Sequence, residues 1–152
     1  MPDLYVVFRV AFFSGFVSCG LAVLRGTRFH AFPTIYTAAF FCGGIFYYFN
    51  RLGLPFTGGF MATAVVCIIV RIFHAMGKHG YLFIIIPCIY CITPGSALYR
   101  MFLAFFHLNW PEFIFQLSYS TKVCLGCWLA MVLVTRMGDL VIKTKVSEEK
   151  YI

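Results

Sequence analysis

The sequence predicts an all-α, polytopic membrane protein, and three observations carry this prediction. The chain is 62% hydrophobic and only 11% charged, too little charge to cover the surface of a soluble domain of this size. Its apolar residues form long runs that are separated by short hinges containing glycine, asparagine or basic residues. Its net charge of +7 lies at the ends of these runs rather than on a polar face, a pattern typical of membrane helices and not of nucleic-acid binding.

A helical span needs about 20 apolar residues, so the chain is expected to contain about five spans within a single membrane domain, residues 1–152. The expected spans are residues 4–24, 32–49, 54–76, 80–107 and 113–137. The second is the shortest, although Pro33 is acceptable at a helix start. If this segment does not cross the membrane, the chain has four spans.

Basic residues favour one side of the membrane in the five-span arrangement, which predicts an external N-terminus and a cytoplasmic C-terminus. The basic side holds Arg25, Arg28, Arg71, Lys78, Arg136, Lys143, Lys145 and Lys150. The opposite side holds Asp3, Arg51, Glu112 and Lys122. Arg9 and Arg71 lie inside spans but near their ends, where a long side chain can reach the interface.

Small residues recur at every fourth position and predict close helix contacts. The first span carries Ser14, Ser18 and Ala22 at this spacing, and the fifth carries Gly126 and Ala130. Packing within the chain is the expected use of most of these faces. Some faces are also candidates for contact with another chain, because a few small spans enclose little volume.

The fourth run is interrupted by Pro87 and by the segment Thr93-Pro94-Gly95-Ser96. Proline removes a backbone donor and clashes with the preceding turn, and glycine loosens the chain further. A straight helix over residues 80–107 would be about 42 Å long, against a hydrocarbon core of about 30 Å. We therefore expect a fourth helix that is broken at Pro94-Gly95, inside the bilayer.

The second half of this helix defines the candidate site. Ser96 is expected to cap the half-helix, whose first N–H groups and positive dipole end suit a carboxylate or phosphate. Discontinuous helices present substrate sites in this way in transporters. The candidate substrate-binding residues are Pro94, Gly95, Ser96, Tyr99 and Arg100. The alternative is a proline kink that only shapes packing.

Two Cys-x-x-Cys pairs, Cys88/Cys91 and Cys124/Cys127, suggest a thiol oxidoreductase or a metal site as a lesser alternative. Both pairs lie within expected spans, whereas a reactive thiol needs access and a structural zinc site needs a closed tetrahedral cage. The chain also lacks recognisable catalytic motifs. We therefore expect no enzyme activity, no metal and no cofactor.

The interrupted run resembles the signature of the threonine/serine exporter (ThrE-like) family, and in particular the small membrane subunit of its split, two-component version. The matching residues are Pro87, Pro94, Gly95, Ser96, Tyr99 and Arg100. Cys91 stands where the family commonly has proline. The resemblance implies a secondary transporter that exports threonine, serine or a dicarboxylate such as succinate across the bacterial inner membrane. It also implies a larger ThrE-like subunit as partner. The alternative is a scaffold or accessory subunit that does not itself transport.

Overall fold

The computed structural model describes residues 4–75, 81–93 and 95–148, and these residues form helices and short turns without any strand. The elements are α1 (Leu4–Leu24), the 3₁₀ turn η1 (Phe29–Ala31), α2 (Phe32–Arg51), α3 (Pro55–Ala75), α4 (Tyr81–Tyr90), α5 (Gly95–Phe106) and α6 (Trp110–Glu148). The prediction of an all-α chain is confirmed. Asp3, Lys78, Lys150 and the expected span ends at residues 76 and 80 lie outside the described residues.

The expected spans match the first three helices to within two residues at each end. The expected fourth span is divided, as predicted, because α4 ends at Tyr90 and α5 begins at Gly95. The last helix differs most, since α6 continues to Glu148 instead of ending near residue 137. Loss of hydrophobicity ends a span but not a helix, and the segment after residue 137 contains no proline that would stop one.

Within the described residues, four helical segments are long and apolar enough to cross a membrane: Leu4–Leu24, Phe29–Arg51, Pro55–Phe73 and Trp110–Arg136. The pair Ile84–Tyr90 and Gly95–Phe106 meets the same criteria together, with a bend of 49° between its halves. In length and composition the chain is therefore built as a helical membrane protein.

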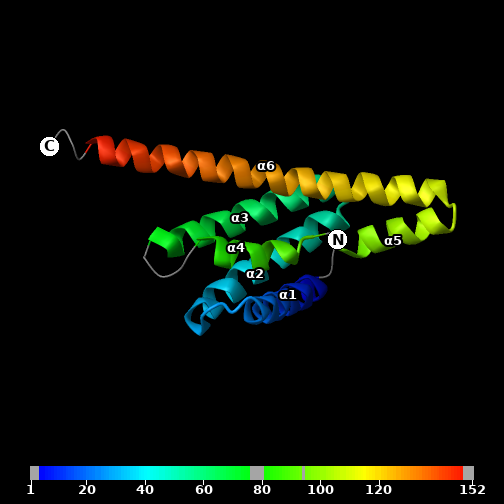
Figure 1. Ribbon diagram of the computed structural model, residues 1–152, viewed down its shortest axis with the longest axis horizontal. Coiled ribbons are helices and arrows are strands. Elements are labelled where there is room, and N and C mark those ends of the chain that lie inside the picture. The colour runs from blue at the N-terminus through cyan, green and yellow to red at the C-terminus, as the bar shows by residue number, and fades with distance from the viewer. Residues whose placement is uncertain (1–3, 76–80, 94, 149–152) are drawn as a thin grey trace.

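The helices α1, α2 and α3 lie side by side, and α4 packs against all three (Figure 1). The long helix α6 lies along α3, whereas α5 packs mainly against the first part of α6. As a result, α5 and the start of α6 form a hairpin that projects past the ends of α1, α2 and α3 (Figure 1).

Small residues allow these helices to approach closely, as the sequence predicts. In α1, Ser18 and Ala22 are buried, and a Cβ atom added at Gly43 of α2 would collide with Ser14. A Cβ atom at Gly126 of α6 would collide with the carbonyl oxygen of Phe56 in α3. The repeated small residues therefore serve packing within the chain, since backbones of neighbouring helices meet there.

Arg71 of α3 does more than extend to the membrane interface. Its Nη1 atom donates hydrogen bonds to the carbonyl oxygens of Val134 and Thr135 in α6, at 2.7 and 3.0 Å. A half-buried guanidinium needs acceptors, and the α6 backbone supplies them. Arg71 thus connects the two helices that share the longest contact in the fold.

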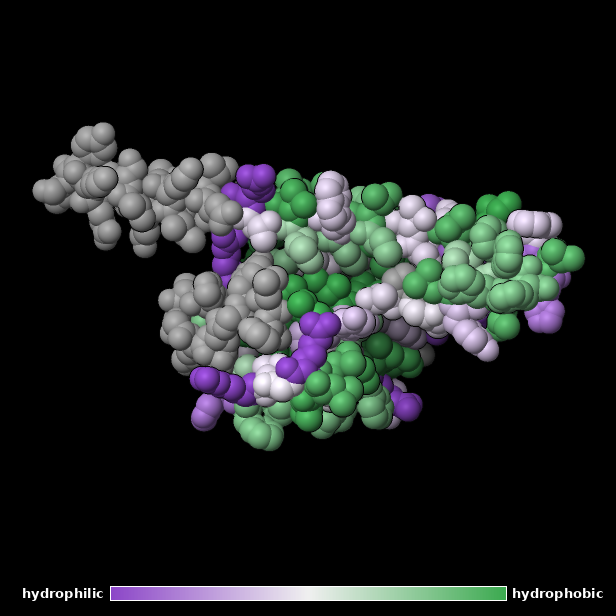
Figure 2. Space-filling view, in the orientation of Figure 1, coloured by the Kyte–Doolittle hydropathy of each residue, from purple (hydrophilic) through white to green (hydrophobic). Residues whose placement is uncertain are grey.

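Polar side chains are unevenly distributed over the molecule. Figure 2 shows a face that is mostly apolar, with a few separate groups of hydrophilic side chains, one of them near its middle. Arg25 and Arg28 follow the end of α1, and α6 runs toward the same end of the molecule (Figure 1). This arrangement agrees with the charge asymmetry on which the predicted orientation depends.

The close contact at Gly126 gives a first testable prediction. Gly126→Ala is expected to lower the free energy of unfolding by about 1–3 kcal/mol, because the added methyl group overlaps the α3 backbone. The matched control is Gly20→Ala in α1, where an added Cβ atom meets nothing within 4 Å. The control should be neutral or stabilising by up to about 1 kcal/mol, from helix propensity alone. Both values can be measured by denaturation of the purified protein in mixed micelles. Equal effects at the two positions would contradict the packing described.

Candidate functional site at the interrupted helix

The last turn of α4 changes its hydrogen-bond pattern before the chain leaves the helix. The Cys91 amide donates to the Cys88 carbonyl at 3.3 Å, and the Thr93 amide lies between the Ile89 and Tyr90 carbonyls at 3.2 and 3.3 Å. These are partly three-residue bonds, which tighten the final turn. The helix therefore ends at Tyr90 although the surrounding sequence remains apolar.

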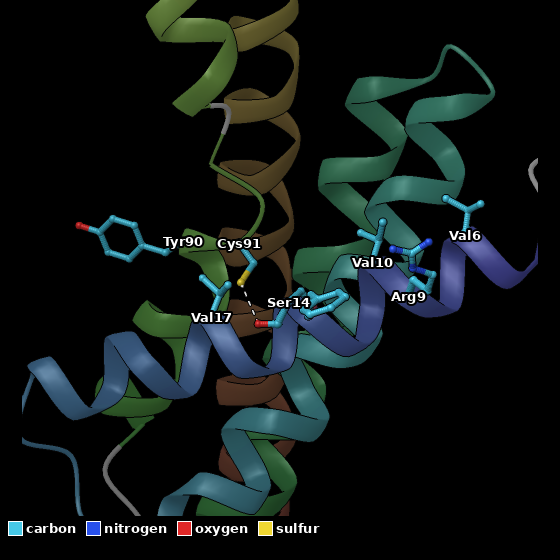
Figure 3. Close-up of a pocket in the computed structure, with 8 residues that line it drawn as sticks. Val6, Arg9, Val10, Ser14, Val17, Tyr90 and Cys91 are labelled. Atoms are coloured by element: carbon cyan, nitrogen blue, oxygen red, sulfur yellow. Dashed lines mark hydrogen bonds between the residues drawn. The ribbon is translucent and has the colours of Figure 1, made fainter.

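The carbonyl group of Pro87 lies in this tightened turn and has a donor from outside α4. The buried hydroxyl of Ser18 in α1 donates to that carbonyl at 3.0 Å. The Cys91 thiol lies 2.8 Å from the Ser18 hydroxyl. It donates to the Ser14 carbonyl at 3.3 Å (Figure 3). Polar groups of α1 thus form hydrogen bonds with polar groups at the end of α4. Such bonds are needed in apolar surroundings, because water is not present to supply them.

These contacts fix the depth of the interruption in the bundle. Ser14 lies at the middle of α1, which runs from Leu4 to Leu24. Each end of α1 is therefore about 15 Å from Ser14 along the helix. The interruption lies level with the centre of a helix that is long enough to cross a membrane.

A groove of about 590 Å³ opens beside the interruption. One wall is a face of α1, and the other contains Tyr90 and Cys91 (Figure 3). Arg9 is the charged side chain of this lining, and its guanidinium lies 5.7 Å from the centre of the Tyr5 ring. On the other wall, the Arg25 guanidinium lies over the Tyr90 ring, 5.7 Å from the ring centre.

The residues predicted from the sequence lie on α5, on the other side of the interruption. Pro94 is outside the described residues. Gly95 is the first residue of α5, so Ser96 is the second helical residue and not the cap that we expected. The correction follows from the helix beginning one residue after Pro94, so that any cap must precede Ser96. Both Ser96 and Tyr99 are exposed.

Arg100 is exposed and lines a separate hollow of about 340 Å³ between α5 and the start of α6. His107, Asn109 and Glu112 line the same hollow. The Glu112 carboxylate accepts a hydrogen bond from Gln116 Nε2 at 2.6 Å. Ser96 and Arg100 are four residues apart and share a face of α5. The structure thus groups the predicted residues on one helix but directs Arg100 toward the α5–α6 turn.

The seven cysteines all lie in the described residues, and none of them forms a disulfide bond. Within the first pair, Cys88 donates to the Ile35 carbonyl at 3.7 Å, whereas Cys91 donates to the Ser14 carbonyl. Cys127 contacts the Gly59 carbonyl at 3.7 Å, and Cys124 is exposed. The described residues contain no group of three or more His, Cys, Asp or Glu side chains that could hold a metal ion.

Sequence reasoning missed the contribution of α1 to this site. Ser14 and Ser18 were interpreted as small packing residues, yet their backbone and hydroxyl groups bind the interrupted helix. Arg9 was interpreted as an interfacial residue, yet it lines the groove beside the interruption. The sequence feature that could have indicated this contribution of α1 is the four-residue spacing of two serines on one face of an otherwise apolar helix.

The chain matches no protein-family model, no curated protein and no solved structure. The likeness to the exporter family therefore consists of the motif residues on α4 and α5. Function has to be argued from those residues and from the geometry around them.

The Ser18–Pro87 hydrogen bond gives a second prediction. Ser18→Ala should lower the free energy of unfolding by about 1–2 kcal/mol, because the Pro87 carbonyl loses its buried donor. The matched control is Ser118→Ala, the same substitution at an exposed position of α6, which should change stability by less than about 0.5 kcal/mol. Denaturation in mixed micelles measures both. A loss that is no larger for Ser18→Ala than for the control would show that α1 does not stabilise the interruption.

Proposed function

We propose that the protein is the small subunit of a two-component secondary transporter that exports small carboxylates, such as threonine, serine or succinate. The observation that carries the proposal is the interrupted helix, which ends level with the centre of a membrane-length helix. Interruptions at this depth are costly in hydrocarbon and are used by transporters to bind substrate.

The start of α5 supplies the chemistry for a carboxylate. The first N–H groups of a helix have no helical acceptors, and the dipole makes this end positive. An added Cβ atom at Gly95 would meet nothing within 4 Å, so the backbone there is open to an approaching ligand. In the proposed site, Ser96 and these N–H groups bind the carboxylate, Arg100 adds a full positive charge, and Tyr99 contributes a hydroxyl.

A larger ThrE-like subunit is the proposed partner, and the α5–α6 hairpin is the surface that would meet it. Large apolar side chains of α5 and of the following turn remain exposed in this hairpin: Leu98, Tyr99, Phe102, Leu103, Phe105, Phe106 and Leu108. In a bilayer, exposed apolar side chains of this kind can face lipid or the helices of a second subunit. The five acidic residues of the chain lie near the ends of the expected spans or beyond them, so a proton carrier for coupled export would belong to the partner.

The proposed topology has five spans in the bacterial inner membrane, with the α4–α5 pair as the bent fourth span. Its N-terminus is external and its C-terminus is cytoplasmic. The basic residues that follow α1 and the basic tail then lie on the same, cytoplasmic side.

Reporter fusions test this topology. Alkaline phosphatase fused after Gly53, between α2 and α3, should be active because that turn is external. The same reporter fused after Gly26, between α1 and α2, should be inactive, while green fluorescent protein fused to the C-terminus should fluoresce. Equal phosphatase activity at Gly26 and Gly53 would mean that α2 does not cross the membrane.

The transport role is tested with Arg100→Ala in cells that produce both candidate subunits. Export of labelled threonine and succinate should fall by about 10- to 100-fold, because a charged hydrogen bond contributes about 1.5–3 kcal/mol. Arg51→Ala, an exposed arginine that stacks on Tyr47 at 5.3 Å, is the matched control and should leave export unchanged. Membrane levels and co-purification with the partner should be equal for both variants. Unchanged export by Arg100→Ala would remove Arg100 from the mechanism.

An accessory role without transport is the alternative, and the Ser18–Pro87 bond favours it. The end of α4 is satisfied by α1, as in a kink that only shapes packing. Reconstitution separates the two roles. If the partner alone exports as fast as the pair, this chain is a scaffold, and if export needs both chains, it is part of the transporter.

A further inference from the structure

The groove beside α1 has the length of one half of a bilayer. Along α1 its lining extends from Val6 to Val17, and Tyr90 and Cys91 lie near its inner end (Figure 3). These eleven steps along the helix correspond to about 16 Å. The hydrocarbon core is about 30 Å thick, so the length of the groove along α1 is about half of that thickness.

The chemistry of the lining changes along this length. Val10, Phe13 and Val17 make the inner part apolar, whereas Arg9 lies near the outer end. A guanidinium close to the end of a span extends toward the headgroup region. The groove therefore combines a cation at headgroup depth with an apolar channel below it.

We propose that this groove binds one anionic phospholipid from the leaflet on the N-terminal side. Its phosphate pairs with the Arg9 guanidinium, and one acyl chain lies along Val10, Phe13 and Val17 as far as Tyr90. This site lies on α1 and does not depend on the transport role proposed for α5.

A small free anion fits the same groove less well, because the polar atoms at the inner end of the groove already form hydrogen bonds within the protein. The Ser14 hydroxyl lies against the carbonyl oxygens of Ala11 and Ala39, at 2.9 and 2.6 Å. The Cys91 thiol donates to the Ser14 carbonyl. Arg9 alone would hold a small carboxylate, and the apolar channel would remain unfilled. A phospholipid satisfies both parts of the groove.

The test compares lipids that differ only in headgroup charge. The purified full-length protein is incubated with equimolar phosphatidylglycerol and phosphatidylcholine that carry identical chains, and bound lipid is counted by native mass spectrometry. The wild type should retain phosphatidylglycerol about fivefold better, the preference that one basic side chain at the surface provides. Arg9→Gln should reduce this ratio to about one.

Arg51→Gln is the matched control, since Arg51 also stacks on a tyrosine one turn earlier but is not part of the lining of this groove. It should keep the fivefold preference. Val17→Trp leaves Arg9 intact and fills the inner groove from an exposed position, so it should reduce the number of retained lipids. The proposal fails if the wild type shows no headgroup preference, or if Arg51→Gln loses it as completely as Arg9→Gln. Displacement of the lipid by millimolar succinate would instead assign the groove to a small carboxylate.

Discussion

The hydrogen bond from Ser18 to the Pro87 carbonyl is the constraint on which the rest of the structure depends. An interrupted helix in apolar surroundings is stable only if its freed carbonyl groups find donors. Here the donor is a small residue of α1, and its short side chain requires α1 and α4 to lie close together. The neighbouring contact between the Cys91 thiol and the Ser14 carbonyl places the end of α4 level with the middle of α1.

The position of α6 follows from a second close contact and has consequences for the shape of the molecule. Because Gly126 meets the backbone of Phe56 near the start of α3, the part of α6 that begins at Trp110 extends about 24 Å beyond that contact. α5 accompanies this part of α6 (Figure 1). The hairpin is thus displaced along the bundle axis from α1, α2 and α3, and its apolar side chains need a neighbour other than those helices.

Much of the fold could be predicted from the sequence, because hydrophobic run length and proline or glycine positions are local properties. They located α1, α2, α3 and the interruption between Tyr90 and Gly95. The direction in which a side chain points depends on how each helix is rotated against its neighbours, which no local pattern specifies. For that reason the sequence did not reveal that Arg71 binds the α6 backbone or that Arg100 lines the α5–α6 hollow. The end of α6 was also missed, since hydrophobicity marks where a span ends and not where a helix ends.

In the proposed roles, Arg9 and Arg100 would bind two kinds of anion on opposite sides of the interruption. Arg9 lies on α1 above an apolar channel whose inner polar atoms are already hydrogen-bonded, an arrangement suited to a headgroup with its chain. Arg100 lies beyond the interruption on α5, in a hollow that it shares with Asn109 and Glu112 and that is suited to a small polar ligand. Ser18 ties the end of α4 to α1 and leaves the start of α5 outside that contact. The interruption therefore divides the bundle into a part that α1 and α4 hold together and a projecting α5–α6 hairpin, and the proposed substrate and second subunit would both meet that hairpin.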